Sequence, residues 1–212
     1  MSSILQKRSP DSRAIRSAIR TGQQCFPWRI AVGAIAVVFG GFIIHPRNIF
    51  GAFAPAAGAV SLICIALGLA LRAWGAACAG DHTRSGQIEA PRLVTGGPYA
   101  FVRNPIYLGS FVLGLGVIGL FGDPWLLVPH AVVFGVFFGM IVPAEEQFLM
   151  ARFGEDYARF CRAVPKFVPR LNRWKEAVDP PHCWRAARGE AVIGLVVLLI
   201  YGVFRAILLV RR

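Results

Sequence analysis

The chain has 212 residues, of which 56% are hydrophobic and 16% charged, and its formal net charge is +12. A soluble domain carries about 25% charged residues, so this composition and the long apolar runs exclude an ordinary soluble domain and favour a bilayer as the solvent. The basic residues cluster beside the apolar runs, where anionic headgroups attract them. This placement argues against nucleic acid as the partner.

The N-terminal half contains two predicted spans. Residues 1–27 are polar and basic, and they fit a cytoplasmic segment that is either disordered or lies on the membrane surface. The first span is expected over 28–44 and the second over 53–79. The second is rich in small residues that allow helices to approach closely, and Gly68 and Gly75 are interpreted as packing surface.

A membrane hairpin is predicted in the middle of the chain. Residues 80–103 form a polar connection, after which apolar sequence runs over 107–121 and returns over 125–142. The turn between the two runs, Gly-Asp-Pro at 122–124, favours a tight reversal. Arg72, late in the preceding span, is expected to snorkel or to face a site.

The last third begins with an amphipathic pattern. Aromatic and aliphatic residues recur at helical spacing with charges between them, which predicts an interfacial helix broken by Gly154 and ended by Pro165. A basic linker follows, and a final span is expected over 191–210.

These elements predict an all-α, polytopic transmembrane helix bundle of about five spans, with an amphipathic interfacial helix. The expected divisions are a basic segment 1–27, a membrane core 28–170, a basic linker 171–190 and a C-terminal transmembrane helix 191–212. The positive-inside rule favours a cytoplasmic N-terminus, and Arg211 and Arg212 at the outer end disagree only mildly. The five cysteines form no CxxC pair, so no metal site is predicted.

The chemistry is expected in two polar islands, residues 92–109 and 145–165. Because the hairpin between them turns back at Gly122, Asn104 and the Glu145–Glu146 pair should return to the same membrane face. Adjacent carboxylates at a membrane boundary are costly unless they are paired, and Arg103 is a candidate partner.

Each part of the islands also has a plainer interpretation. The two glutamates suit a solvated helix start, where carboxylates favour the N-terminal dipole. Arg103, Asn104 and Pro105 suit an ordinary helix start with proline in the first turn. Tyr99 and Tyr107 suit an interfacial aromatic belt. None of these interpretations explains why the islands occur together.

The ordered set of residues resembles the isoprenylcysteine carboxyl methyltransferases and, more distantly, the phospholipid methyltransferases. The resemblance covers about residues 84–170. It rests on Leu93, Val94, Thr95, Gly97, Tyr99, Arg103, Asn104, Pro105 and Tyr107 in the first island, and on Glu145, Glu146, Leu149, Phe153, Gly154, Tyr157, Val164 and Pro165 in the second.

The resemblance implies an S-adenosyl-L-methionine site built from both islands. The cofactor-binding residues it implies are Arg92, Leu93, Val94, Tyr99, Asn104, Pro105, Ile106, Tyr107 and Glu145, with Glu145 binding the ammonium group through a charge-assisted hydrogen bond. Arg103, Asn104, Tyr107 and Glu146 are the candidate catalytic residues, and Glu146, Tyr107 or a water is expected to assist deprotonation of an amine acceptor.

Two departures from the family pattern leave the methyl acceptor open. Asn104 stands where the family has histidine, which puts a titrating role in doubt but not cofactor contact. Ile141 stands where the eukaryotic enzymes have an arginine for the substrate carboxylate, which argues against a prenylcysteine substrate.

The predicted function is therefore methylation of a lipophilic or membrane-associated acceptor, at a carboxylate, an amine or a thiol. The partners expected are the lipid bilayer and a lipophilic substrate, and the sequence does not indicate the oligomeric state. Two alternatives stay open: an NADPH-dependent membrane reductase of the sterol-reductase type, and a non-enzymatic membrane scaffold.

Overall fold

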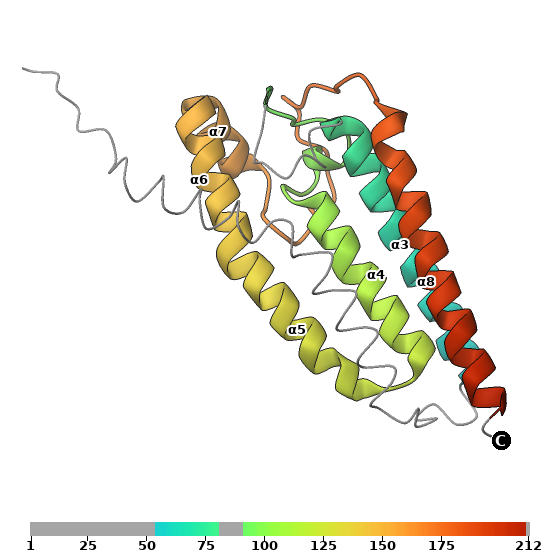
Figure 1. The fold of residues 1–212 in the computed structure, drawn as a ribbon. Coiled ribbons are helices and arrows are strands. Elements are labelled where there is room, and N and C mark those ends of the chain that lie inside the picture. The colour runs from blue at the N-terminus through green and yellow to red at the C-terminus, as the bar shows by residue number, and fades with distance from the viewer. Residues whose placement is uncertain (1–53, 81–90, 211–212) are drawn as a thin grey trace, which may run out of the picture.

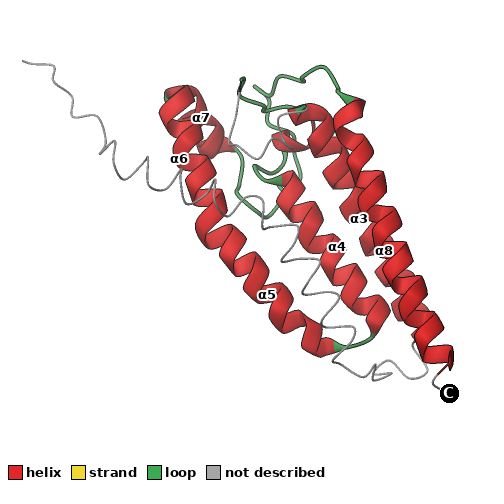
Figure 2. Ribbon diagram, in the orientation of Figure 1, coloured by secondary structure: helices red, strands yellow, loops and turns green. Residues whose placement is uncertain are grey.

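The protein is a bundle of long helices with loops gathered at one end (Figure 1). The computed structural model of the chain describes residues 54–80 and 91–210, so the predicted basic segment and the predicted span over 28–44 lie outside the described residues. The part of the chain that is described contains helices and no strands (Figure 2). The all-α class is therefore confirmed for these residues.

Helices α3 (Ala54–Ala79) and α4 (Pro105–Phe121) form the central pair. They approach closely because glycines face each other: a Cβ added to Gly68 would lie 2.7 Å from the Gly109 carbonyl oxygen. Close contact of helix backbones is a common way of packing in lipid, where the hydrophobic effect between helices is weak. The prediction that Gly68 belongs to a packing surface is confirmed.

The predicted hairpin is present. Helix α4 starts at Pro105 and ends at Gly122, whose φ of 66° is a left-handed conformation that glycine adopts without strain. The Asp123 carboxylate then accepts a hydrogen bond from the Trp125 backbone N–H at 2.9 Å, which fixes the reversal. A short 3-10 helix, η4 (Pro124–Leu126), leads into the returning helix.

The returning helix is longer than expected. It runs through α5 (Leu127–Val136), a π-helical turn η5 (Phe137–Ile141) and α6 (Val142–Phe153) without a break. Gly154 then separates α6 from α7 (Glu155–Ala163), as the sequence predicts.

Helix α8 (Trp184–Val210) packs along α3, as Figure 1 shows. It begins seven residues earlier than the predicted span over 191–210, because Arg185, Arg188 and Glu190 continue the helix into the polar end of the bundle. The division of the chain into core, linker and C-terminal span stays a prediction.

Exposed apolar side chains form a belt along three helices of the bundle. Large hydrophobic residues are more than 40% exposed on three helices: Val60, Leu62, Ile63 and Leu67 on α3, Leu127, Val128, Val132, Val136 and Met140 on α5 and the π-helical turn, and Val192, Leu195, Val196, Leu198, Leu199 and Val203 on α8. By length and composition, Ala56–Ala79 and Pro124–Phe153 are able to cross a membrane, and Pro105–Phe121 is a shorter apolar helix. The protein is located in the membrane, and the count of about five spans stays a prediction.

Candidate functional site

The first island packs against the polar end of α3. It contains the 3-10 helix η3 (Gly97–Ala100), whose first residue has a φ of 58°. A Cβ at Gly97 would lie 2.5 Å from the Cys78 Sγ atom, so a larger residue there would push the loop off α3. Glycine at this position therefore brings Pro98 and Tyr99 close to the helix bundle.

The two islands meet at Tyr107 and Glu145. The Tyr107 hydroxyl, in the first turn of α4, donates a hydrogen bond of 2.7 Å to Glu145 Oε1, in the first turn of α6. The prediction that the hairpin returns the second island to the first is confirmed. The structure thus brings together the residue predicted to bind the ammonium group and one of the predicted catalytic residues.

Tyr99 lies within electrostatic reach of this pair. Burial raises the pKa of the Tyr99 phenol above its usual range, and the negative forms of Cys78 and Glu145 act in the same direction. The phenol is therefore neutral, and it lies within electrostatic reach of the Glu145 carboxylate. The Tyr107 hydroxyl bonds to that carboxylate directly.

Glu146 faces a different set of partners. Its Oε1 atom lies 3.0 Å from the Arg103 Nη1 atom, and its Oε2 atom lies 2.5 Å from the Lys166 Nζ atom. The Arg103 and Glu146 side chains are only 14% and 19% exposed. The prediction that Arg103 compensates a carboxylate of the pair is confirmed, and the carboxylate is that of Glu146.

Arg103 and Asn104 tie the first island to the end of α7. The Arg103 backbone N–H donates to the Pro165 carbonyl oxygen at 2.9 Å, and its Nη1 atom donates to the Cys161 Sγ atom at 2.7 Å. The Asn104 Nδ2 atom donates to the Lys166 carbonyl oxygen at 3.2 Å. Both residues thus hold the segment that leads into α4.

Tyr157 on α7 belongs to the same group of side chains as Arg103, Glu146 and Cys161. Its phenol is buried, and burial raises the pKa of the hydroxyl, as do Glu146 and Cys161, whereas Arg103 acts in the opposite direction. Leu93 and Tyr99 pack against the core formed by Tyr157, Phe160 and Val164. The aromatic spacing on α7 therefore serves to bury the first island against this helix.

The other predicted cofactor residues are spread around the loop. The exposed Arg92 donates from Nη2 to the Cys78 carbonyl oxygen at 3.3 Å, and Val94 is half-buried. Pro105 is buried, and Ile106 lies against α3, because a Cβ at Gly75 would meet its Cγ1 atom at 2.8 Å. The side chains of Pro105 and Ile106 thus pack on α3. Any contact of these two residues with a ligand would therefore involve their backbone atoms.

Residues 165–183, which we call the strap, cover the first island. Besides the bonds of Arg103 and Asn104 to Pro165 and Lys166, four hydrogen bonds join the strap to this island. They run from Arg170 N–H to the Phe101 carbonyl (3.0 Å), from Trp174 N–H to the Ala100 carbonyl (3.1 Å), from Val178 N–H to Thr95 Oγ1 (3.2 Å) and from Gly97 N–H to Asp179 Oδ1 (2.9 Å). The sequence indicates only a basic linker for most of this segment. Its role was not predictable, because backbone amides make most of these bonds.

Comparisons with known proteins agree with the motif pattern. Residues 56–156 match the family model described as phospholipid methyltransferase. The chain is 36% identical over 79 residues to a protein-S-isoprenylcysteine O-methyltransferase of Schizosaccharomyces pombe, which is 37% of this chain and 34% of that protein. It is 34% identical over 84 residues to protein-S-isoprenylcysteine O-methyltransferase B of Arabidopsis thaliana, covering 40% of this chain and 43% of the relative.

A third relative is named for metal resistance and not for methyl transfer. The chain is 34% identical over 86 residues to the cobalt-zinc-cadmium resistance protein CzcN of Cupriavidus metallidurans, covering 39% of this chain and 38% of the relative. The matched stretch thus spans less than half the length of each of these three relatives. No solved structure matches the chain. The resemblance indicated by the motifs is confirmed, and the family model matches residues 56–156.

Proposed function

Because residues 56–156 carry the pattern of the phospholipid and isoprenylcysteine methyltransferase family, we propose that this membrane protein is an S-adenosyl-L-methionine-dependent methyltransferase. Its acceptor is a lipophilic or membrane-associated molecule that is methylated at a carboxylate, an amine or a thiol. The hydrogen bond between Tyr107 and Glu145 is the observation that supports this proposal most, because it joins the two motif-bearing islands in one place.

The residues present fit the proposed cofactor. S-adenosyl-L-methionine has an ammonium group, a carboxylate and an aromatic base, so its site requires a carboxylate, N–H donors and aromatic or apolar surfaces. Glu145 supplies the carboxylate, Tyr107 supplies an aromatic ring whose hydroxyl bonds to it, and Tyr99 supplies a second ring within electrostatic reach. We assign Arg92, Leu93, Val94, Asn104, Pro105 and Ile106 to the rest of the binding segment.

The proposed chemistry asks little of the protein beyond positioning. The cofactor supplies a methyl group already activated by a sulfonium, and transfer is an in-line displacement. The protein has to orient the donor and the acceptor and to exclude water. A thiolate or carboxylate acceptor needs no base, whereas an amine has to arrive deprotonated.

We assign different roles to the two glutamates. Both oxygens of Glu146 have a cationic partner, Arg103 or Lys166, which suits a residue that anchors the loop. We assign Glu145, which accepts a hydrogen bond from Tyr107, to the cofactor's ammonium group. We assign the orientation of the acceptor to Tyr107 rather than to Glu146. Arg103 and Asn104 hold the start of α4 in place. Asn104 does so through its amide donor, a role that requires no titrating histidine.

Binding of S-adenosylhomocysteine by the purified full-length protein tests the proposal. A ligand that binds only the folded state raises the melting temperature, and NADPH, the cofactor of the alternative reductase function, should leave it unchanged. Glu145→Gln should weaken binding about ten- to hundredfold, because a hydrogen bond to a charged group contributes roughly 1.5–3 kcal/mol.

Glu155→Gln is the matched control. Glu155 lies at the start of α7, and its ion pair with Arg162 is exposed on both sides, so this variant should bind like the wild type. Absence of any shift with S-adenosylhomocysteine would overturn the proposed function. A shift that survives in Glu145→Gln would overturn only the assignment of the ammonium site.

The match to a metal-resistance protein favours a second candidate role. The methyltransferase would then act in tolerance to cobalt, zinc or cadmium, through an acceptor in the membrane. Growth of cells with and without expression of the protein in each metal tests this role. Equal growth of the two kinds of cell in all three metals would exclude the role. Labelled methionine followed by mass spectrometry of lipids and small thiols identifies the acceptor.

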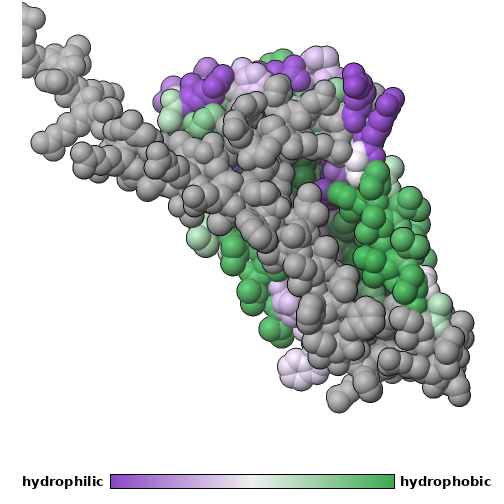
Figure 3. Space-filling view, viewed as in Figure 1, coloured by the Kyte–Doolittle hydropathy of each residue, from purple (hydrophilic) through white to green (hydrophobic). Residues whose placement is uncertain are grey.

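We also propose that the protein crosses the membrane several times, with the site at the cytoplasmic face. The proposed spans are 28–44, α3, α4, the continuous helix from Pro124 to Phe153, and α8. The exposed apolar belt and the gathering of polar side chains at one end support this arrangement (Figure 3).

A further inference from the structure

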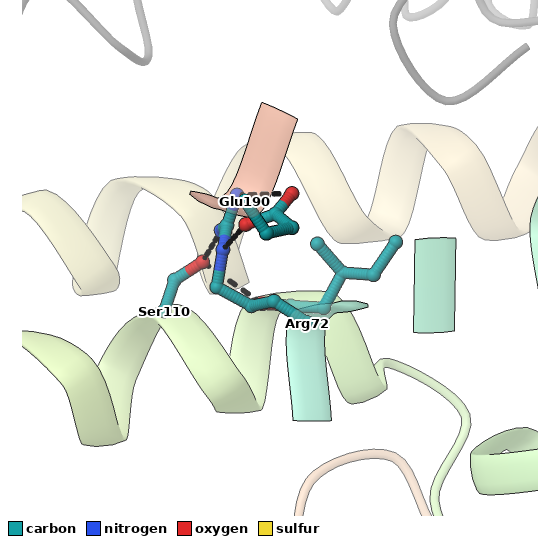
Figure 4. A network of polar contacts seen from close by, with 4 residues as sticks. Arg72, Ser110 and Glu190 are labelled. Atoms are coloured by element: carbon teal, nitrogen blue, oxygen red, sulfur yellow. Dashed lines mark hydrogen bonds and ion pairs between the residues drawn. The ribbon is translucent and has the colours of Figure 1, made fainter. Parts of the chain in front are cut away.

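A bidentate ion pair lies between α3 and α8 inside the bundle. The Arg72 Nε atom is 2.6 Å from Glu190 Oε2, and its Nη2 atom is 3.1 Å from Glu190 Oε1, as Figure 4 shows. The two side chains are 16% and 7% exposed. Glu190 lies outside residues 56–156, which the family model matches.

Attachment of α8 to the bundle does not require this pair. Ile193, Val197 and Ile200 already pack α8 against the buried core of α3 and α4. Replacing a buried ion pair by apolar residues of similar size is often neutral or stabilising, because desolvation of the charges offsets their attraction. An ionisable pair beside a membrane span therefore points to a role other than adhesion.

The pair continues into α4. Arg72 Nη1 donates a hydrogen bond to the Ser110 hydroxyl, and Ser110 in turn donates to the Ile106 carbonyl oxygen at 2.8 Å. The stem of Arg72 also passes close to the backbone of α4, because a Cβ at Gly109 would lie 2.7 Å from the Arg72 Cγ atom. The side chains of Arg72 and Ser110 thus connect Glu190 to the first turn of α4.

That turn bears the residues of the proposed site. Ile106 precedes Tyr107, whose hydroxyl bonds to Glu145. A charged partner for Arg72 fixes the direction of its guanidinium plane, because the bidentate geometry allows one orientation of the fork. This orientation aims Nη1 at Ser110, so the hydrogen bond links the guanidinium group to α4.

We propose that Glu190 is a positioning residue, which acts through Arg72 and Ser110 to hold the first turn of α4 where Tyr107 meets Glu145. The proposal rests on the proposed function. It means that α8 contributes a positioning residue to the site. Its effect on ligand binding should be roughly two- to thirtyfold, the range for networks that couple distant positions by 0.5–2 kcal/mol.

Two variants and one control test the proposal. Glu190→Gln removes the charge that orients Arg72, and Ser110→Ala leaves the ion pair in place but interrupts the path to Ile106. Val117→Ala is the control, because Val117 packs in the same core near the opposite end of α4. Each protein is measured for melting temperature, for affinity for S-adenosylhomocysteine, and for hydrogen exchange of residues 105–110 without ligand.

Glu190→Gln and Ser110→Ala should both weaken S-adenosylhomocysteine binding and speed exchange over residues 105–110, whereas Val117→Ala should lower only the melting temperature. If Ser110→Ala binds and exchanges like the wild type, Glu190 is only structural and the proposal fails. If the wild type does not bind S-adenosylhomocysteine, the proposed function fails, and exchange in the two variants still decides whether Glu190 positions α4.

Discussion

The contact between Tyr107 and Glu145 is the residue-scale basis of the proposed site. It joins the first turn of one helix to the first turn of another that is 38 residues away in sequence. A carboxylate that accepts a hydrogen bond from a tyrosine hydroxyl is held in a fixed direction. Preorganisation of this kind lowers the entropy cost of binding a cationic group.

Tyr107→Phe should therefore weaken S-adenosylhomocysteine binding by roughly five- to tenfold, since one hydrogen bond contributes about 1 kcal/mol net. The ring is kept, so its contact with Phe137, at 6.2 Å between centroids, should persist. Isothermal titration of the purified protein measures the change.

Tyr201→Phe serves as the control for Tyr107→Phe. Tyr201 lies on α8 and packs edge-on against Phe121, near the end of α4 remote from the site. Equal affinity in Tyr107→Phe and the wild type would show that Glu145 is oriented without the hydroxyl.

At the scale of elements, the sequence predicts the helices better than their contacts. The predicted spans 53–79 and 107–121 differ by two residues or fewer from Ala54–Ala79 and Pro105–Phe121. Long apolar runs bounded by glycine and proline determine such helices locally. The pairing of Arg72 was missed because Glu190 lies in a segment interpreted as a linker, and only the packing of α8 brings the two together.

The π-helical turn η5 is the other feature that the sequence did not predict. The expected span ended at about residue 142. The structure places the π-helical turn at Phe137–Ile141, just before Val142, and the helix continues to Phe153. One extra residue in a turn rotates the rest of the helix by about 100°, so this turn sets the face on which Glu145 lies.

The strap carries a prediction about pH. Asp179 accepts hydrogen bonds from the Gly97 backbone N–H and from Arg173, and these contacts lower the pKa of its carboxyl below the usual value. A carboxyl whose pKa is lower in the folded state stabilises the fold above its unfolded pKa. That stabilisation is lost as the pH falls through the folded pKa.

Wild-type protein should therefore melt at a higher temperature than Asp179→Asn at pH 5–7. The difference should shrink as the pH falls below the ordinary carboxyl value of 3.8. Melting curves of both proteins over this range measure it, and Asp156→Asn, which removes an exposed ion pair with Arg159, is the control. A difference that grows on acidification would contradict the assigned contact.

At the scale of the whole molecule, polarity divides the protein lengthwise. Figure 3 shows hydrophilic side chains gathered at the end that bears α7 and the loops, with hydrophobic side chains over α8 and α5 away from it. The islands and the strap all lie at the polar end, because helices α3, α4 and α6 each place the relevant terminus there (Figure 1). Since basic loops are retained in the cytoplasm, this end should face inward.

Labelling of single cysteines tests that orientation. In a variant whose five native cysteines are replaced, a cysteine is introduced at Leu171, which is 98% exposed on the strap, or at Trp125, which is 63% exposed at the hairpin turn. A membrane-impermeant maleimide added to intact cells should label position 125. Position 171 should react only after the membrane is opened, because the hairpin crosses the bilayer between the two positions.

The reverse labelling pattern would place the site outside the cytoplasm. Labelling of both positions in intact cells would mean that the hairpin does not separate them across the membrane.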